Sequence, residues 1–201
     1  MKIRINRIVK FTTVEGFGKR YCIWVQGCSI QCNGCANKLL WSKHGGKEYE
    51  TSEIINDISS QKDNIEGVTF LGGEPFEQAE ALVEISKEIR KKGYSIITFT
   101  GYTYEKLCLN DDRYIRALIN NTDLLIDGPF ELKKTNFSRP WVGSTNQKYI
   151  FLTQRYKKYE DKMDKIKNKF EINIQRNGQV LINGMGDFNK IVEQLNSEFI
   201  K

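Results

Sequence analysis

Short apolar runs alternate along the chain with amphipathic segments, and this pattern predicts strands that alternate with helices. β-Branched and aromatic residues predict strands at 1–10, 21–26, 68–71, 94–100, 124–126 and 149–152. Apolar positions three and four residues apart predict helices that begin near Thr51 and Tyr104 and others that span 77–91 and 113–119. The polar residues 43–50 are expected to form a loop. Repeated strand–helix–strand units with apolar strands indicate an α/β fold with a parallel sheet and crossover helices.

The last third of the chain has a different pattern. Residues 156–169 are strongly charged and predict a helix with a solvated face. Residues 170–182 alternate on either side of Asn177-Gly178, which predicts a β-hairpin with a type I′ turn, and 187–199 predict a closing helix. We therefore expect a core at 1–155 and a C-terminal helix–hairpin–helix extension at 156–201, packed on the same domain.

Composition narrows the class of protein. The 201 residues suffice to bury a core without disulfides. The net charge of +6 reflects a basic excess at 155–169, and nucleic-acid binding is not expected because no recognised motif accompanies it. No apolar run is long enough to span a membrane, and the N-terminus is too polar for a signal peptide. We expect a cytoplasmic protein with reduced thiols and no membrane partner.

Three of the five cysteines, Cys28, Cys32 and Cys35, lie within eight residues with the spacing CxxxCxxC. We interpret them as ligands of an iron–sulfur cluster held at three corners, because a site with three protein ligands keeps one metal position open for chemistry. Gly34 gives the loop a residue that tolerates positive φ.

Other kinds of cysteine site fit this sequence less well. Buried core thiols have no reason to cluster, and an odd number of cysteines without a secretory signal argues against a disulfide framework. A structural zinc site is the main alternative. It needs a fourth ligand, and only Cys22, Cys108 and His44 remain for that role.

Further candidate residues follow the predicted strands directly. Gly72-Gly73-Glu74-Pro75 comes after one strand, Thr100 ends the next and Asp127 ends a third, while the cysteine loop follows residues 21–26. The carboxyl ends of parallel strands meet at one edge of a sheet, so these residues are expected to converge there. The two glycines would let the backbone approach a ligand, and Glu74 would place an anion near an ammonium group.

Taken together, these motifs resemble the radical S-adenosylmethionine (radical SAM) superfamily. The CxxxCxxC spacing resembles its cluster signature, and Gly72-Gly73-Glu74-Pro75 is similar to its GGEP motif, which holds the methionyl amine. Over about three quarters of the chain, roughly residues 5–152, the sequence resembles the glycyl-radical-enzyme activases, above all those of anaerobic ribonucleotide reductase. The segments that carry this likeness are 15–20, 25–28, 32–37, 100–102, 125–130 and 143–147. The chain departs from the family at Ala36, where His is frequent, and at Val142, where Arg is common.

The resemblance implies an incomplete (βα)6-like radical SAM barrel with the C-terminal hairpin and helix as an extension. It implies a [4Fe–4S] cluster on Cys28, Cys32 and Cys35, reduced by flavodoxin or ferredoxin. Bound SAM would then be cleaved to a 5′-deoxyadenosyl radical that takes hydrogen from a glycine of a partner glycyl radical enzyme. The implied SAM contacts are Gly72, Gly73, Glu74, Pro75, Thr100 and Asn146, with Gln147 beside them.

Within this implied mechanism, Asp127 could position the partner's glycyl loop, although a solvated turn residue explains it nearly as well. Two other functions stay open at this point. One is a small radical SAM enzyme that modifies a peptide or a small molecule. The other is a zinc-binding or cluster-binding interaction module without catalysis.

Overall fold

The computed structural model describes residues 1–174, 176–178, 180–187, 193 and 197. Its main sheet has seven strands in the order β3-β1-β2-β4-β5-β6-β7. These strands are β1 (Lys2–Thr12), β2 (Arg20–Val25), β3 (Lys47–Glu50), β4 (Gly67–Gly72), β5 (Ser95–Phe99), β6 (Leu124–Asp127) and β7 (Lys148–Phe151). The central strands β2, β4, β5 and β6 pair in parallel, whereas β1, β3 and β7 pair antiparallel with their neighbours. The predicted α/β class with parallel central strands is confirmed, but closure into a barrel and a count of six βα units are not.

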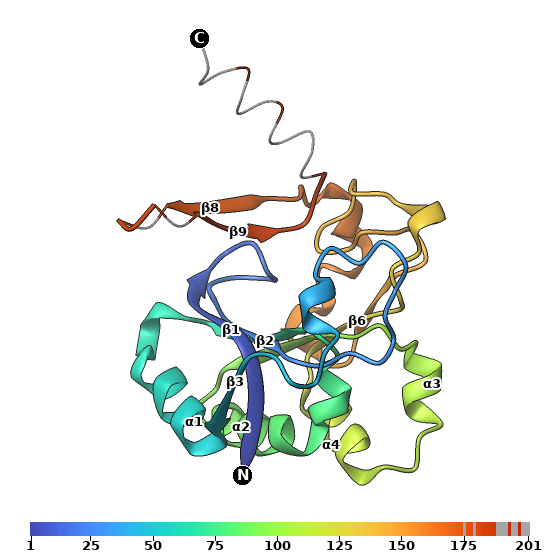
Figure 1. Cartoon of the computed structure of the whole chain (residues 1–201). Coiled ribbons are helices and arrows are strands. Elements are labelled where there is room, and N and C mark those ends of the chain that lie inside the picture. Colours follow the sequence, from blue (N-terminus) through green and yellow to red (C-terminus); the bar gives the residue numbers. More distant parts are fainter. Residues whose placement is uncertain (175, 179, 188–192, 194–196, 198–201) are drawn as a thin grey trace.

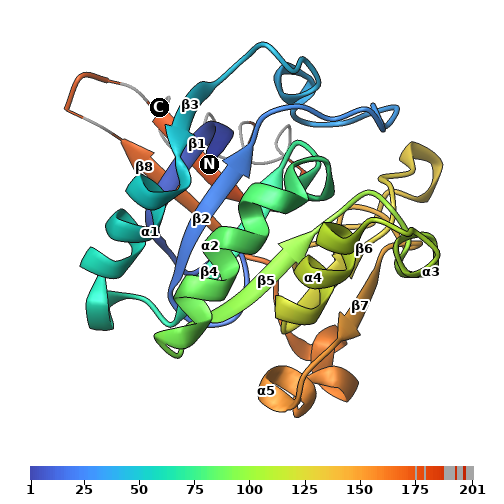
Figure 2. The same ribbon diagram turned by 90° about the horizontal axis from the view of Figure 1, so that it is seen from below.

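Helices connect the parallel strands and cover one face of the sheet. The α-helices are α1 (Thr51–Ser60), α2 (Ala79–Lys91), α3 (Tyr104–Cys108), α4 (Arg113–Asn121) and α5 (Gln154–Lys157). Short 3-10 segments are η1 (Lys38–Leu40), η2 (Lys62–Asn64), η3 (Pro75–Gln78), η4 (Leu132–Lys134) and η5 (Glu160–Lys165). Figure 2 shows α1, α2 and α4 side by side on this side of the sheet, which we call the helical face. In the described part of the chain, no helix has the length and apolarity needed to cross a membrane.

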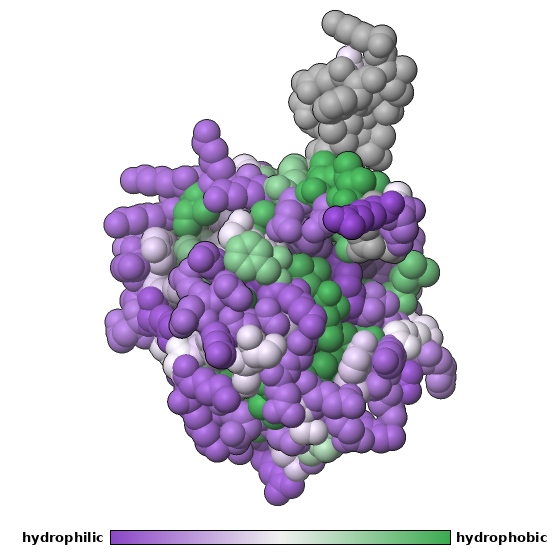
Figure 3. All heavy atoms as spheres, turned by 90° about the vertical axis from the view of Figure 1, so that its left-hand side faces the viewer, coloured by the Kyte–Doolittle hydropathy of each residue, from purple (hydrophilic) through white to green (hydrophobic). Residues whose placement is uncertain are grey.

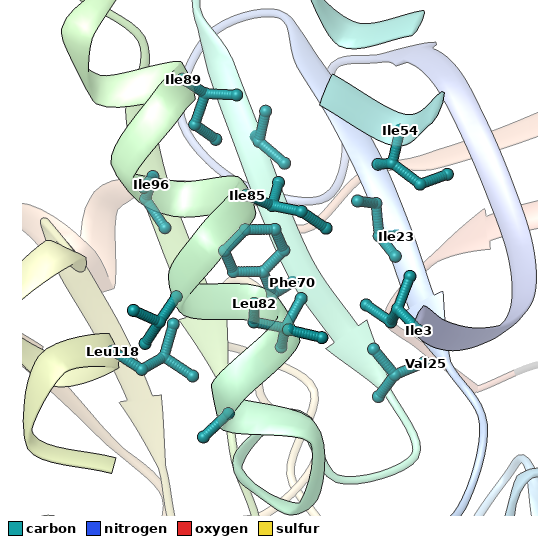
Figure 4. Close-up of a cluster of buried hydrophobic side chains, with 14 of the residues drawn as sticks. Ile3, Ile23, Val25, Ile54, Phe70, Leu82, Ile85, Ile89, Ile96 and Leu118 are labelled. Atoms are coloured by element: carbon teal, nitrogen blue, oxygen red, sulfur yellow. The ribbon is translucent and has the colours of Figure 1, made fainter. Parts of the chain in front are cut away.

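The main core lies between the helical face and these helices. Alternate residues of the strands, such as Ile23, Val25 and Phe70, point toward Leu82 and Ile85 of α2 (Figure 4). All five are fully buried. This packing explains the amphipathic pattern of 77–91, in which apolar positions recur at helical spacing and meet the apolar positions of the strands.

The opposite face of the sheet carries the C-terminal hairpin (Figure 1) and, beside it, the short helices α5 and η5, whose Tyr156 and Met163 pack in one apolar cluster with Ile97. We call it the pocket face. The strands β8 (Phe170–Ile174) and β9 (Val180–Gly184) pair antiparallel, and Gly178 has φ 82°, so the predicted hairpin is confirmed. Apolar side chains of the hairpin remain exposed, among them Ile174 and Val180. Figure 3 shows apolar side chains gathered on the side where the hairpin projects.

Two expectations about local structure were wrong. Residues 43–50 do not form only a loop, because β3 pairs with β1 at the edge of the sheet. Its side chains are polar since an edge strand needs backbone hydrogen bonds more than apolar contacts. Residues 156–169 form no continuous helix, because the chain ends α5 after one turn and continues as η5. The predicted helix at 187–199 lies outside the described residues, and the division into two parts stays a prediction.

Candidate cofactor site

The cysteine loop leaves the carboxyl end of β2 and is closed by backbone hydrogen bonds at its base. The Gly27 amide donates to the Leu40 carbonyl oxygen at 2.9 Å, and the Cys28 amide donates to the Trp41 oxygen at 3.2 Å. Gly34 has φ 86°, as its position between the second and third cysteines predicts. The loop therefore presents its three thiols from one closed segment, and each thiol is partly exposed.

Backbone amides surround the sulfur atoms. Burial raises the pKa of the Cys28 thiol, while the amides of Ile30 and Gln31 act in the opposite direction. Burial likewise raises the pKa of the Cys32 thiol, and the Phe130 amide opposes it. Such N–H donors stabilise the thiolate form that binds a metal. Hydrogen bonds to the sulfur atoms also tune the reduction potential of an iron–sulfur cluster. This donor set fits an iron–sulfur cluster.

The three thiols are not gathered around a single point. In the described ranges, no group of three His, Cys, Asp or Glu side chains is arranged to hold one metal ion. A cluster does not require such an arrangement, because each thiolate bonds a different iron atom.

The turn after β4 packs against the base of the cysteine loop. The Gly73 amide donates to the Val25 oxygen at 2.8 Å, and the Glu74 amide donates to the Gly27 oxygen at 2.8 Å. A β-carbon at Gly73 would lie 2.2 Å from the Gly27 oxygen, which leaves no room for any side chain. The second glycine is therefore required by this close approach of two backbones, whether or not a ligand is bound.

Glu74 is fully buried beside this turn and is bonded to Thr100, another of the predicted site residues. Its carboxylate accepts hydrogen bonds from the Thr100 hydroxyl at 2.8 Å, the Gly101 amide at 2.9 Å and the Phe76 amide at 3.0 Å. Burial raises its pKa to about 7, although these three donors favour the charged form. Glu74 thus links the carboxyl ends of β4 and β5 through hydrogen bonds to both of its carboxylate oxygens.

A cavity of about 460 Å³ opens on the pocket face, and we call it the cofactor pocket. Seven of the predicted site residues line it: Cys28, Cys32, Cys35, Gly72, Gly73, Glu74 and Thr100. Gln147 lines it as well. The predicted convergence at the carboxyl ends of β2, β4 and β5 is therefore seen in the structure, and the role of each residue toward a ligand stays a prediction.

Three predicted residues do not line the cofactor pocket: Pro75, Asn146 and Asp127. Asn146 donates to the Pro129 oxygen at 2.7 Å, and its own carboxamide oxygen is buried without a partner in the described part of the chain. Asp127 accepts a 2.7 Å hydrogen bond from the Tyr104 amide at the start of α3, and burial raises its pKa. The contacts of Asp127 are those of a structural turn, and a role toward a partner is still a prediction.

Sequence reasoning missed the residues at the hairpin side of the cofactor pocket. Arg7 lies over the Trp24 ring, 4.0 Å from its centroid, and both line the cavity with Glu15. Glu15 is buried, which raises its pKa to about 7, and it accepts a 2.8 Å hydrogen bond from the Gly184 amide. Asn183 also lines the cavity. For Asn183 the signal in the sequence was the alternation of the hairpin, which does not show where the hairpin packs.

The sequence of the chain is similar to those of known proteins. Residues 14–150 match a family described as a 4Fe-4S single cluster domain. An anaerobic ribonucleoside-triphosphate reductase-activating protein of Haemophilus influenzae is 31% identical over 141 residues, which are 67% of this chain and 88% of that protein. The protein with the same description from Pasteurella multocida is 32% identical over 148 residues, 70% of this chain and 92% of that one. A pyruvate formate-lyase-activating enzyme of Clostridium pasteurianum is 35% identical over 128 residues, 61% of this chain and 50% of its own length.

Proposed function

Because the chain belongs to the radical SAM family of glycyl-radical-enzyme activating proteins, we propose that it installs a glycyl radical on an anaerobic ribonucleoside-triphosphate reductase. Members of this family use a [4Fe–4S] cluster and SAM. When bound and reduced, these cofactors supply a carbon-centred radical that removes a hydrogen atom from the substrate. The observation that carries the proposal is the meeting of the three-cysteine loop and the Gly72–Gly73 turn at one cavity.

In this proposal each part of the site has a separate task. Cys28, Cys32 and Cys35 hold three corners of the cluster. The turn at Gly73 holds the SAM amine near the cluster, and Glu74 supplies the opposite charge while it fixes the Thr100 loop. Flavodoxin or ferredoxin would deliver the electron. We also take the curved sheet to be a partial barrel of the (βα)6 type, whose open side admits the partner's glycine.

Anaerobic reconstitution with iron and sulfide tests the chemistry first. Dithionite and SAM should then yield 5′-deoxyadenosine, and Cys32→Ala should abolish the product. The matched control is Cys108→Ala, since Cys108 is exposed and does not line the cofactor pocket. Added reductase should then acquire a glycyl radical detectable by EPR. Tightly held zinc without any product would contradict the proposal.

One observation favours a second candidate function, a small radical SAM enzyme that modifies a peptide or a small molecule. The C-terminal hairpin lies beyond the family match and closes part of the cofactor pocket through Ile182, Asn183 and Met185. A more enclosed cavity suits a smaller substrate. Deoxyadenosine formation without any radical on the reductase would favour this candidate.

A further inference from the structure

The hairpin side of the cofactor pocket differs from the cysteine side in the kind of group it presents. Asn183 of β9 is 3% exposed and lines the cavity, yet its carboxamide oxygen has no hydrogen-bond partner among the described residues. A buried acceptor without a partner costs about 1–3 kcal/mol. Such a cost is expected where a ligand supplies the missing donor.

The positively charged side chain of Arg7 lines the same cavity. The guanidinium of Arg7 is held over Trp24 and lines the cofactor pocket with Asn183. Arg7 comes from β1 and Asn183 from β9, so the packing of the hairpin on the sheet brings an acceptor and a donor to one cavity. A peptide amide needs both, since its N–H requires an acceptor and its carbonyl oxygen requires a donor.

The hairpin is tied down at this point by side chains of the main sheet and its loops. The Gly184 amide donates to the buried carboxylate of Glu15 at 2.8 Å. The Glu15 carbonyl oxygen in turn accepts a 2.9 Å hydrogen bond from the Thr69 hydroxyl of β4. Thr12 of β1 donates to the carboxylate of Glu171. These contacts fix the residue next to Asn183, so its carboxamide has a defined place in the cavity.

Location along the strands separates this side of the cavity from the cluster. The cysteine loop and the Gly72–Gly73 turn follow the carboxyl ends of β2 and β4. Glu15 precedes β2 and is bonded to Thr69 in the body of β4. The hairpin is therefore anchored beside the body of the strands, whereas the residues that would hold the cluster and the SAM amine follow the carboxyl ends of those strands.

We propose that Asn183 and Arg7 form a recognition site for the peptide backbone of the glycine-bearing substrate segment, with Glu15 as the residue that positions the hairpin. This inference rests on the proposed function and names the residues that would read its substrate. A glycine has no side chain to grip, so an enzyme that acts on it must hold its amide groups. The carboxamide oxygen of Asn183 accepts a hydrogen bond from a peptide N–H, and the guanidinium of Arg7 donates one to a peptide carbonyl oxygen.

The test measures binding of a synthetic peptide that carries the radical glycine of the reductase, by fluorescence anisotropy on the anaerobically reconstituted protein with SAM. Asn183→Ala should weaken peptide binding about tenfold, the value of one hydrogen bond of about 1.4 kcal/mol. Asn183→Asp keeps an acceptor oxygen and should restore most of the affinity. The matched control is Asn173→Ala, since Asn173 lies on the same hairpin, is exposed and does not line the cavity.

A second readout separates the substrate from the cofactor. Asn173→Ala should form 5′-deoxyadenosine without peptide within about twofold of wild type, so a loss of this uncoupled cleavage seen only in Asn183→Ala would assign Asn183 to SAM binding. Unchanged peptide affinity in this variant, or no binding of the peptide by wild type, would overturn the inference. Loss of the uncoupled cleavage would also overturn it, since the site would then belong to SAM. If wild type binds the peptide but never forms the radical, the proposed function fails instead.

Discussion

The two faces of the main sheet are built by alternate residues of the same strands, yet they contain different chemistry. On the helical face, Ile23, Val25 and Phe70 pack against helices in a continuous apolar core. On the pocket face, Trp24 and Leu71 share a cavity wall with the buried carboxylates of Glu15 and Glu74.

The comparison shows where stability and function are placed in this protein. The helical face carries the larger apolar cluster and with it most of the hydrophobic stabilisation, while smaller apolar clusters lie on the pocket face beside the cavity. The pocket face keeps buried charges and an unpartnered amide that oppose folding, as is expected of a site kept for a ligand.

Neighbouring residues of β4 provide the sharpest test of this difference. Phe70 is fully buried on the helical face, and Leu71 lines the cavity on the other. Phe70→Ala should lower the free energy of unfolding by about 3–5 kcal/mol, because it removes a ring from a packed core. Leu71→Ala should cost about 2 kcal/mol, because it only enlarges an existing cavity. Urea denaturation measures both, and equal losses would contradict the assignment of stability to the helical face.

The buried carboxylates predict how stability depends on pH. Burial raises the folded-state pKa of Glu15 from 4.5 to about 7. The folded protein therefore binds this proton more tightly than the unfolded chain, and stability falls as the pH rises from about 4.5 to about 7. The loss from one such group is on the order of 3 kcal/mol and is complete above pH 7.

Denaturation between pH 5 and pH 8 checks this dependence. Wild type should be less stable at pH 8, and Glu15→Gln should reduce the difference, with Glu74 responsible for the part that remains. The control is Glu80→Gln, since Glu80 is exposed on α2 and should leave the pH dependence as it is. A Glu15→Gln profile as steep as that of wild type would contradict the prediction.

The close approach of two backbone segments at Gly73 predicts that a side chain there lowers both stability and the rate of SAM cleavage. Its β-carbon would lie 2.2 Å from the Gly27 oxygen, so Gly73→Ala must push the turn away from the cysteine loop. We expect a loss of about 1–3 kcal/mol in unfolding free energy, typical of overpacking, and slower cleavage of SAM. The neighbouring Pro75→Ala serves as the control, because Pro75 does not line the cavity. Unchanged cleavage in Gly73→Ala would show that the turn does not set the cofactor geometry.

The parallel strands could be predicted to within one or two residues, because a strand buried on both faces is an apolar run bounded by turns. The edge strand β3 could not, because its polar sequence looks like a loop and its pairing with β1 is a tertiary contact. The helix expected at 156–169 from its charged sequence is replaced by α5 and η5, and tertiary contacts accompany the change. Asn168 donates to the Phe137 and Arg139 carbonyl oxygens, and this requires the chain to leave the helical path.

The candidate site also contains residues that the sequence predicts and residues that it does not. The cysteine loop and the Gly72–Gly73 turn were predictable because their chemistry lies in short motifs that follow strands. The roles of Glu15 and Asn183 were not predictable. Asn183 is brought to the pocket by the hydrogen bond of its neighbour Gly184 to Glu15, and these two residues are about 170 positions apart in the sequence. Nothing local in either sequence segment indicates that the hairpin covers the pocket.

The smallest expected effect concerns polar groups of the pocket face that hold the fold rather than a ligand. The Tyr156 hydroxyl donates to the Ser95 hydroxyl at 2.7 Å and accepts from the fully buried Arg20 guanidinium at 3.2 Å. Neither Tyr156 nor Arg20 lines the cofactor pocket. Tyr156→Phe should therefore lower the free energy of unfolding by about 1–2 kcal/mol and leave SAM cleavage unchanged.

Urea denaturation and the deoxyadenosine assay measure the two parts of this prediction. Tyr159→Phe is the matched control, since Tyr159 stacks on Phe17 at 4.4 Å and its hydroxyl has no hydrogen-bond partner within the described residues. Its unfolding free energy should stay within about 0.5 kcal/mol of wild type. If Tyr156→Phe impaired cleavage while stability held, the polar groups around Arg20 would have to be counted with the site. The division between the two faces would then have to be redrawn within the pocket face itself.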